Sequence, residues 1–499
     1  WRTDGQQMWQ HPDLLDDPWG DARVPHDEQE KATAVRDFAQ HLAARLGLPD
    51  DVVRAAYEDP ITQWHNEIRQ PAGEKPDDDV DALDPDRAQK LAAKEQAPEL
   101  PTGWVLPIFP DPDGDGWGSA IWRTRRDHLY LTPGTSPMGL RLPLSSIAWT
   151  EAPFTPDASP FAASGTLPTP EELTSDDVAP ATLHDIEESP RTALTVEARD
   201  GHLFVFLPPL SELDDALRML AAIEQAAVAT GTPVVLEGYA PPSGAGRLKS
   251  LTVTPDPGVI EVNVQPTSSW EELEDLTTTL FDDARRTRLA TEKFDLDGSH
   301  TGTGGGNHIT LGGSTPKDSP LLRRPDLLRS LITFWQHHPA LSYVFSGRFI
   351  GPTSQSPRVD EGRHETLYEL EIAFHELDRV TKESDGEPRP WLTDRLLRHL
   401  LTDITGNTHR SEFCIDKLYS PDSDRGRLGI LELRGFEMPP HARMSLVQAL
   451  LVRTLVARFW NEPYEGALVR WGSRLHDRFL LPAFAAADLR DVVADLNRF

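Results

Sequence analysis

The hydrophobic pattern is helical near the start of the chain and changes to short, strand-like runs after about residue 100. EQEKATAVRDFAQHLAARLGL predicts a helix that begins at residue 28 and ends near Gly47, within a region over 28–70 expected to be helical. The apolar runs that follow are separated by turn sequences and read WVLPIF, SAIWRT, HLYLT and LRLPL. They predict a small β-rich subdomain over 101–150.

From residue 192 the pattern becomes a mixture of strands and helices. TALTVEARDGHLFVFLPPL predicts a hairpin with Asp200-Gly201 at its turn, and a helix follows. Four further strands are predicted over 234–239, 258–264, 307–313 and 429–436. The helices that separate or follow them are WEELEDLTTTLFDDARRTRLA, PDLLRSLITFWQHH, ETLYELEIAFHEL and ARMSLVQALLVRTLVARFW. Strands and helices without a strict βαβ rhythm predict an α+β fold.

Polar segments between these regions suggest the domain boundaries. Residues 1–100 are predicted to form a helical N-terminal segment with an acidic connector, and residues 151–190 a linker rich in Pro, Ser, Thr and acidic residues. A chain of 499 residues is too long for one ordinary hydrophobic core. We therefore expect the β-rich subdomain at 101–150 and one larger catalytic domain over 191–499.

Each of the four strands after residue 230 carries polar residues in the middle of an apolar run. Residues i and i+2 of a strand share a face. The pairs that share a face are Glu261 and Asn263, His308 and Thr310, and Glu432 and Arg434, with Glu237 alone on its strand. Carboxylates with an imidazole suit Mg²⁺ or Mn²⁺, and a neighbouring arginine suits a phosphate or carboxylate. The pattern predicts a wet, charged and concave sheet face.

Each of these residues also has a simpler interpretation. Glu432 and Arg434 could form an ordinary ion pair on an edge strand, and His308 could be a hydrogen-bonded core histidine. Glu237 and Glu261 could face solvent on an antiparallel sheet. The joint pattern favours a metal site formed by Glu237, Glu261, His308 and Glu432.

Residues 300–313, HTGTGGGNHITLGG, gather six glycines around a short apolar step. The segment is not a P-loop, because G-x-x-x-x-G-K-[ST] is absent, and Asn307 stands where a dinucleotide fingerprint needs its third glycine. A glycine arm that leads into a strand lets backbone N–H groups approach an anion, with His308 just behind it. A flexible hairpin without a ligand is the alternative.

Composition narrows the class of partner. The 80 acidic and 49 basic residues give a net charge of −31, which argues against a nucleic-acid backbone as the partner. No apolar run is long enough for a membrane helix, and the first residues, WRTDGQQMWQ, have no apolar h-region, so we expect no signal peptide there. The single cysteine, Cys414, excludes a disulfide framework and a zinc site built from several cysteines. It fits a reducing cytoplasm, and we interpret it as a buried structural thiol rather than a nucleophile.

Four segments of the chain resemble the bacterial amidoligase family, in which a domain of unknown function often follows a transglutaminase-like domain. The segments are HTGTGGGNHITLGG, RRPDLLRSLITFWQHHPALSYVFSGRFIGPTSQSPRVDE, GNTHRSEFCIDKLYSPD and LELRGFEMPPHARMSL. The resemblance covers essentially the whole chain and is dense from 230 to 485. It implies a distant relation to glutamine synthetase and the carboxylate–amine ligases, with a curved, mainly antiparallel sheet that holds ATP and Mg²⁺ or Mn²⁺.

The resemblance also implies roles for residues of two segments. Gly304-Gly305-Gly306-Asn307-His308 is similar to the synthetase G-S-G-M-H segment, whose histidine holds a metal at the ATP phosphates. Glu432 and Arg434 match the E-x-R strand, with the acid on a metal and the arginine near the transferred phosphate. The chain departs from the synthetase pattern at Thr310, where a second histidine is common.

Further roles follow from the same resemblance. Glu237 and Glu261 fall where the fold places carboxylates for the other metal, and Arg410 near its phosphate- or substrate-binding arginines. Independently of the resemblance, Arg358 lies in a segment rich in Gly, Pro, Ser and Thr, and this position predicts a further nucleotide contact. Family members usually carry an upstream G-G-E-P-T-F-like strand, which these 499 residues lack.

The predicted function is an ATP- and Mg²⁺-dependent carboxylate–amine ligase that acts through an acyl phosphate. Its substrates would be small-molecule or peptide carboxylates and amines. The alternative is a catalytically inactive nucleotide- and metal-binding module that supports a transglutaminase-like or ATP-grasp partner, which the missing upstream strand favours. A third hypothesis is a metal-dependent hydrolase that uses His300, His308 and Glu432 and needs no ATP.

Overall fold

The computed structural model of the chain describes residues 1–58, 100–147, 161, 165–303 and 305–499, apart from short gaps at 113, 115, 125–128, 176–177, 188, 245, 364, 384–388 and 421–425. The chain divides into two compact units. The first comprises Trp1–Pro156 and Gly165–Leu248, and the second comprises Asp157–Ser164 and Lys249–Phe499. The predicted boundary at residue 191 therefore lies inside the first unit.

The first unit is built on a six-stranded mixed sheet in the order β5-β1-β2-β7-β8-β9. The β5–β1 and β8–β9 pairs are parallel, and the other pairs are antiparallel. The bounds of its elements are η1 Pro12–Leu14, α1 Glu28–Arg45, β1 Arg54–Glu58, β2 Gly103–Pro107, β3 Phe109–Pro110, β4 Trp117–Ser119, β5 Leu129–Leu131, η3 Met138–Leu140, η4 Leu144–Ser146, α4 Pro170–Leu173, β6 Thr182–Leu183, β7 Ala193–Arg199, β8 His202–Leu207, α5 Leu213–Thr230 and β9 Val234–Gly238.

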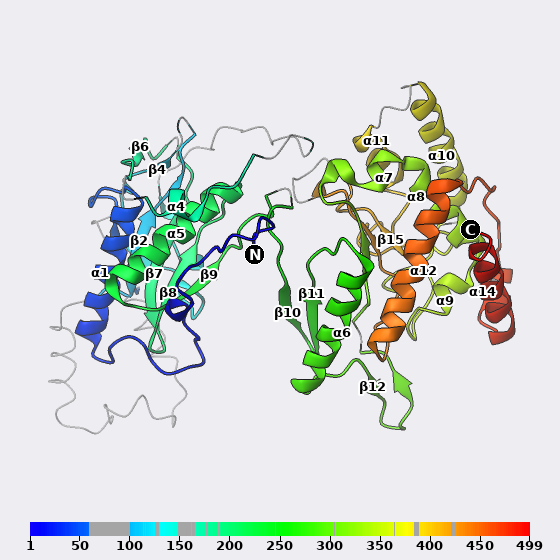
Figure 1. Cartoon of the computed structure of the whole chain (residues 1–499), viewed down its shortest axis with the longest axis horizontal. Coiled ribbons are helices and arrows are strands. Elements are labelled where there is room, and N and C mark those ends of the chain that lie inside the picture. The colour runs from blue at the N-terminus through cyan, green and yellow to red at the C-terminus, as the bar shows by residue number, and fades with distance from the viewer. Residues whose placement is uncertain are drawn as a thin grey trace. The chain divides into compact units, whose positions relative to one another are not determined.

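Helices α1 and α5 pack side by side over this sheet (Figure 1). Helix α1 begins at its cap, Asp27, whose carboxylate accepts hydrogen bonds from two backbone N–H groups of the first turn. The predicted hairpin is confirmed, because Asp200 and Gly201 both have positive φ, as a tight turn between twisted strands requires. Strand β2 pairs with β7, so the predicted β-rich subdomain and the start of the predicted large domain share one sheet.

Three predicted elements of the first unit were wrong. Of the predicted strand SAIWRT, only Ser119 lies in a strand, β4, and residues 120–124 have no regular secondary structure. In the region predicted to be helical over 28–70, α1 ends at Arg45, Arg54–Glu58 is a strand, and residues 59–70 lie outside the described residues. The backbone of this strand pairs with β2 and β5, and this tertiary pairing outweighs its local preference. The LRLPL run forms 3₁₀ turns on either side of Pro143 rather than a strand, because proline cannot donate a hydrogen bond to a sheet.

The second unit contains three small antiparallel sheets, β10-β11, β12-β13 and β14-β16-β15, among many helices. The bounds of its elements are β10 Thr252–Asp256, β11 Val259–Asn263, α6 Trp270–Arg286, β12 Lys293–Phe294, β13 His300–Thr301, β14 Ile309–Leu311, η5 Pro316–Asp318, α7 Pro320–Arg323, α8 Pro325–His337, α9 Ala340–Tyr343, α10 Thr366–Glu383, α11 Pro390–Leu397, β15 Phe413–Cys414, β16 Leu431–Leu433, α12 Ala442–Asn461, α13 Arg474–Phe479 and α14 Pro482–Leu496. The four strands and four helices predicted from residue 230 onward are all present.

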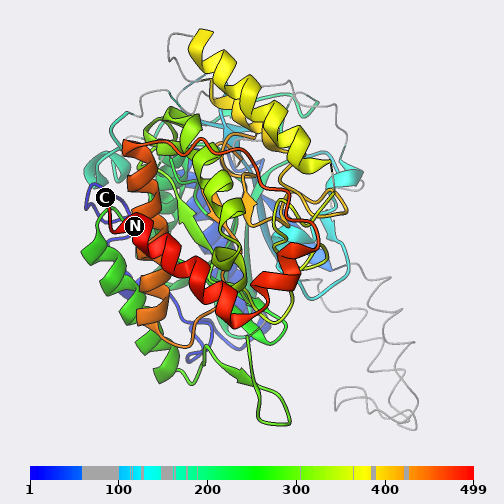
Figure 2. The same cartoon turned by 90° about the vertical axis from the view of Figure 1, so that its right-hand side faces the viewer.

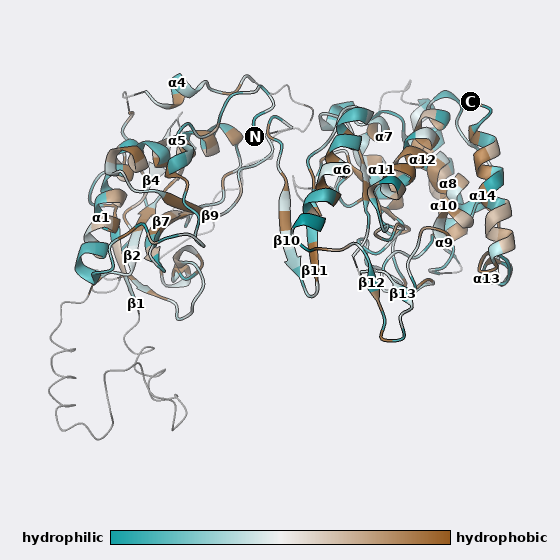
Figure 3. Cartoon of the chain, turned by 60° about the horizontal axis from the view of Figure 1, so that its bottom comes forward, coloured by the Kyte–Doolittle hydropathy of each residue, from teal (hydrophilic) through white to brown (hydrophobic). Residues whose placement is uncertain are grey.

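The core of the second unit lies between α8, α12 and the β14-β16-β15 sheet. Most of α8 is buried, and its Trp335 makes edge-to-face contacts with Phe413 of β15 and with Phe436. Helix α12 packs beside both α8 and α6 (Figure 2). Helix α6 is mainly hydrophilic in Figure 3, which fits its single buried residue, Phe281.

Helices and separate sheets in both units confirm the predicted α+β class. No helix among the described residues combines the length and the apolar character that crossing a membrane requires.

Candidate functional site

The β14-β16-β15 sheet of the second unit has one apolar face and one polar face. Ile309, Leu433 and Phe413 are paired across the three strands and pack in or against the core. One residue along, Thr310, Glu432 and Cys414 are paired in the same way. Because successive side chains on a strand alternate between faces, this second row lies on the opposite side of the sheet.

Glu432 is the centre of a charged cluster on the polar face. Its Oε1 lies 3.0 Å from His308 Nδ1 and accepts a 2.6 Å hydrogen bond from Arg434 Nη1. Its Oε2 lies 3.6 Å from Lys417 Nζ, which is an ion pair but longer than a hydrogen bond. The structure therefore places His308, Glu432 and Arg434 in contact.

Two buried polar atoms of this cluster have no hydrogen-bond partner within the described part of the chain. They are Glu432 Oε2 and Arg434 Nε. Glu432 is only 5% exposed, so water does not readily replace the missing partner. Buried polar atoms are nearly always hydrogen-bonded in native proteins, and exceptions occur at strained or catalytic groups and where a water or an ion binds. Glu432 Oε2 is an acceptor that suits a cation, and Arg434 Nε is a donor that suits an anion. The two together suit a cation and an anion that bind side by side.

The cluster keeps Glu432 ionised. Burial alone would raise the pKa of this carboxyl, but the hydrogen bond from His308 and the positive charges of Arg434 and Lys417 outweigh it and lower the pKa to about 2. When a neutral histidine ring donates from Nδ1, its Nε2 is the acceptor. A histidine that donates one N–H to a carboxylate is oriented as metal-bound histidines usually are.

The glycine arm runs beside the chain that leaves β16. Gly306 is bridged to Glu437, and Asn307 N donates to Phe436 O at 2.9 Å. Ile309 pairs with Leu433, so between these two pairs two residues on the arm face three on the other strand. The extra residue is a β-bulge between Arg434 and Phe436.

This bulge brings Glu437 to the polar face. It follows Glu432 by five positions, and an odd offset would place the two carboxylates on opposite faces of a regular strand. The extra residue reverses that relation. A Cβ at Gly302 would overlap the Glu437 carboxylate, and one at Gly306 would overlap the His308 ring. Two glycines of the arm are therefore needed to make room for these side chains.

Glu437 is a candidate that the sequence analysis missed. It is half-buried, and burial raises the pKa of its carboxyl, against the lowering effect of His300. Gly347 also packs against its carboxylate, so glycines from two segments surround it. In the sequence, Glu437 is the acid that ends L-E-L-R-G-F-E, two residues after the glycine. The pattern of residues does not reveal the bulge that turns this acid to the polar face.

The other predicted metal ligands lie elsewhere. Glu237 is on β9 in the first unit, where Arg199 donates to both of its oxygens at 2.6 and 3.1 Å. Glu261 is exposed on β11 and accepts a hydrogen bond from Asn263 Nδ2 at 3.0 Å. Strand β11 nevertheless begins beside the glycine arm, since a Cβ at Gly305 would lie 3.3 Å from Val259 Cγ1. Of the four predicted ligands, the structure places His308 and Glu432 in contact.

Other predicted contacts have mixed placements. Asn307 Nδ2 donates to Gln448 Oε1 at 2.8 Å, and Asn307 Oδ1 accepts from Ser445 Oγ at 3.3 Å, so this residue fastens the arm to α12. Arg410 is exposed and lies 3.8 Å from Asp403 in a weak ion pair, which leaves it available to a ligand. Gly304 lies outside the described residues.

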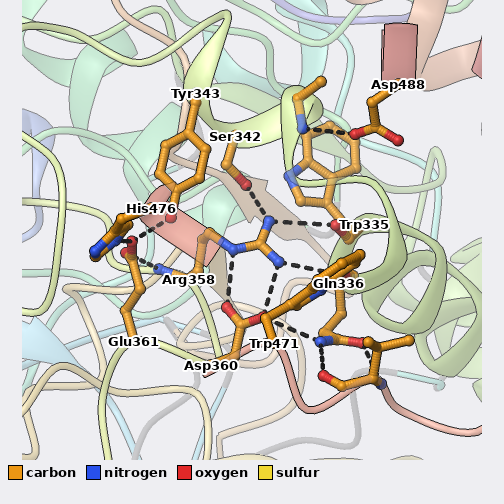
Figure 4. A network of polar contacts seen from close by, with 12 residues as sticks. Trp335, Gln336, Ser342, Tyr343, Arg358, Asp360, Glu361, Trp471, His476 and Asp488 are labelled. Carbon is orange, nitrogen blue, oxygen red and sulfur yellow. Dashed lines mark hydrogen bonds and ion pairs between the residues drawn. The ribbon is translucent and has the colours of Figure 1, made fainter. Parts of the chain in front are cut away.

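Arg358 is buried in a polar network of the second unit (Figure 4). Its five N–H donors bind Asp360 twice, Ser342 Oγ, and the carbonyl oxygens of Trp335 and Gln336. A guanidinium has five donors, so none is left for a phosphate. This geometry contradicts the predicted nucleotide contact and gives Arg358 a structural role instead.

Glu412 is fully buried beside this network. Burial raises the pKa of its carboxyl to about 7, which the positive charge of Arg358 and a hydrogen bond from Ser342 only partly oppose. The unfolded chain releases the proton above pH 4.5, whereas the folded chain keeps it until about pH 7. This group therefore stabilises the fold fully below pH 4.5, and the contribution is lost as the pH rises through 7.

Glu412→Gln should remove this pH dependence, because the amide cannot ionise. The difference in the free energy of unfolding between the variant and the unchanged chain should shift in favour of the variant by on the order of 2–3 kcal/mol from pH 4 to pH 8. Denaturant unfolding at a series of pH values measures the difference. Parallel stability curves for the two proteins would contradict the raised pKa.

Comparison with known proteins identifies the family. The sequence profile of the family described as “Putative amidoligase enzyme” matches residues 1–499, so the chain belongs to this family over its whole length. No curated protein and no solved structure matches the chain.

Proposed function

We propose that this protein is an ATP-dependent carboxylate–amine ligase whose reaction takes place on the polar face of the β14-β16-β15 sheet. The observation that carries the proposal is the Glu432–Arg434 pair, buried and yet with one open atom on each side chain. Membership of the amidoligase family supports the class of reaction. The expected substrates are a small-molecule or peptide carboxylate and an amine.

The reaction would proceed in two steps. The substrate carboxylate attacks the γ-phosphorus of ATP and ADP leaves, which forms an acyl phosphate. The amine then attacks the acyl carbon, phosphate leaves, and the amine loses a proton. A divalent cation bound with ATP would neutralise charge on the transferred phosphoryl group.

The residues of the cluster fit this chemistry. Arg434 Nε and the exposed Arg410 would bind phosphoryl oxygens, whose charge grows in the transition state. Glu432 Oε2 and His308 Nε2 are the open acceptors that would hold the cation. The glycine arm, which is bridged to Glu437 beside the sheet, would close over this face and exclude water, which otherwise hydrolyses an acyl phosphate. The proposal also includes the curved sheet of the glutamine synthetase type, which the resemblance implies.

Glu437 is the group that we propose takes the proton from the amine. It lies on the same face as Glu432, and its pKa is raised by burial, which makes its carboxylate a better base. The room that Gly302 and Gly347 leave for its carboxylate places it beside the arm.

Glu437→Gln should slow amide formation by about 10²–10⁴-fold, the usual effect of losing a general base. Acyl phosphate formation should continue, because that step needs no base. Hydroxylamine is a neutral nucleophile at pH 7, so it should trap the intermediate equally well in the variant and in the unchanged protein. A variant that also fails to form hydroxamate would show that Glu437 acts in the first step or in folding.

The proposed activity is tested by incubating the protein with ATP, Mg²⁺ and pools of amino acids and short peptides. Mass spectrometry should detect products equal to an acid plus an amine minus water, with one ADP released for each. Tight ATP binding without ADP release would support the inactive module instead. Hydrolysis of substrates without ATP would support the hydrolase.

A further inference from the structure

A second group of ligand atoms shares Glu432. His409, Cys414 and Glu432 each offer one such atom, and these atoms all lie within 4.8 Å of one another; no other such trio of His, Cys, Asp or Glu occurs in the described residues. Cys414 on β15 is paired with Glu432 on β16, so their side chains leave the sheet on the same side. His409 lies in the segment before β15, and its Nδ1 is 3.8 Å from Cys414 Sγ.

The spacing of this group suits a small tetrahedral ion. Zinc binds cysteine sulfur at about 2.3 Å and histidine nitrogen at about 2.0–2.1 Å, which separates the two ligand atoms by about 3.6 Å at a tetrahedral angle. The 3.8 Å between Sγ and Nδ1 needs little adjustment. His409 is exposed, so its ring can make that adjustment without disturbing the core.

Glu432 provides the independent sign of a ligand. It is more than nine-tenths buried, and its Oε2 has no hydrogen-bond partner among the described residues. Lys417 Nζ lies 3.6 Å from this oxygen, on a half-exposed side chain. A metal ion can therefore displace the Lys417 ammonium group into water at little cost, whereas no neighbouring side chain already saturates Oε2.

The chemistry of the donors selects the metal. A nitrogen, a sulfur and one carboxylate oxygen form a set that favours Zn²⁺ and similar transition metals over Mg²⁺, which prefers oxygen ligands. Three protein ligands leave the fourth tetrahedral position open. On binding, the Cys414 thiol would release its proton to solvent and coordinate as the thiolate.

We propose that His409, Cys414 and Glu432 form a binding site for Zn²⁺, and that the ion, by occupying Glu432, inhibits the ligase reaction. The binding site stands on its own geometry. Its inhibitory effect rests on the function proposed above, because the nucleotide-bound cation and this ion would compete for Oε2, since Arg434 and His308 already hold Oε1 of Glu432.

Cobalt substitution tests the site without any ATP. Cys414 is the only cysteine of the chain, so a thiolate-to-cobalt charge-transfer band on adding Co²⁺ can come only from this residue. Calorimetry should find one Zn²⁺ site that competes with Co²⁺. His409→Ala should weaken Zn²⁺ binding by about 10–100-fold or more, since even residues behind the ligands matter that much. Cys414→Ser should abolish the band.

His375→Ala is the matched control, because His375 is an exposed histidine on α10 and should leave Zn²⁺ affinity unchanged. Cys414 is buried, so loss of the band in Cys414→Ser could also result from unfolding. His409 is exposed, so His409→Ala should stay folded and still decide whether the site binds Zn²⁺. Absence of the band in the unchanged protein, or equal Zn²⁺ affinity in His409→Ala, would overturn the site.

The inhibitory part has its own readout. Micromolar Zn²⁺ should suppress ADP release by the unchanged protein and leave His409→Ala active at the same concentration. Equal suppression of both proteins would overturn inhibition through this site. If no ADP release is found at all, the ligase proposal fails, while the cobalt band and the calorimetry still decide the metal site.

Discussion

Replacing Glu432 by glutamine is expected to reduce ADP release by about 10²–10³-fold, the effect typical of removing one preorganised electrostatic group from an active site. Glutamine keeps the shape of the side chain but removes the charge that His308, Arg434 and Lys417 surround. It also removes an anionic ligand for the cation that accompanies ATP. Steady-state ADP release at saturating ATP and Mg²⁺ measures the change.

The fold must be checked in the same variant, because Glu432 neutralises a partly buried Arg434. Circular dichroism and thermal unfolding should show that Glu432→Gln is folded at the assay temperature. Glu376→Gln, which changes an exposed carboxylate of α10 in a surface ion pair, should match the unchanged protein in both activity and stability. A folded Glu432→Gln variant with full activity would remove Glu432 from the reaction.

Replacing Arg358 by methionine should destabilise the protein by about 3–5 kcal/mol, because the change removes one partner of a buried ion pair. Asp360 would be left with a buried negative charge, and Ser342 and two backbone carbonyls would lose their donors. A loss of this size is a large part of the stability of an ordinary domain. Denaturant unfolding followed by tryptophan fluorescence is suitable, since Trp335 and Trp471 lie beside the network (Figure 4).

Arg379→Met provides the comparison for this prediction. Arg379 makes two ion pairs with Glu376 and Glu383 on the exposed surface of α10. Exposed pairs contribute little, so this change should cost less than about 1 kcal/mol. Similar losses of stability in the two arginine variants would contradict the structural role of Arg358. A selective loss of ATP affinity in Arg358→Met would instead support the predicted nucleotide contact.

The sequence predicted most elements of the second unit because their periodicity is strong. Helix α8 carries apolar residues around most of its surface, and α12 has a long apolar pattern, so both were visible without tertiary information. The pairing of β2 with β7 was not visible, since it joins segments that a polar linker separates. The strand Arg54–Glu58 was not predicted either, because only its pairing with neighbouring strands of the sheet makes it a strand.

Part of the candidate site was equally predictable. The alternation rule placed Glu432 and Arg434 on one face, and the glycine arm pointed to His308. Glu437 was missed because a one-residue bulge reverses the face on which it lies. Arg358 was misjudged because a loop arginine looks the same in sequence whether it meets a ligand or a buried acid. Burial decides between the two, and burial is a property of the fold.

The amidoligase account depends most on transfer of a phosphoryl group to the substrate carboxylate. Amino acid and peptide pools labelled with ¹⁸O in their carboxyl groups can be supplied with ATP, Mg²⁺ and the protein, and the released phosphate examined by mass spectrometry. An acyl phosphate intermediate predicts one ¹⁸O atom in each phosphate released during amide formation. Amide formation with unlabelled phosphate, or without ADP release, would contradict the account.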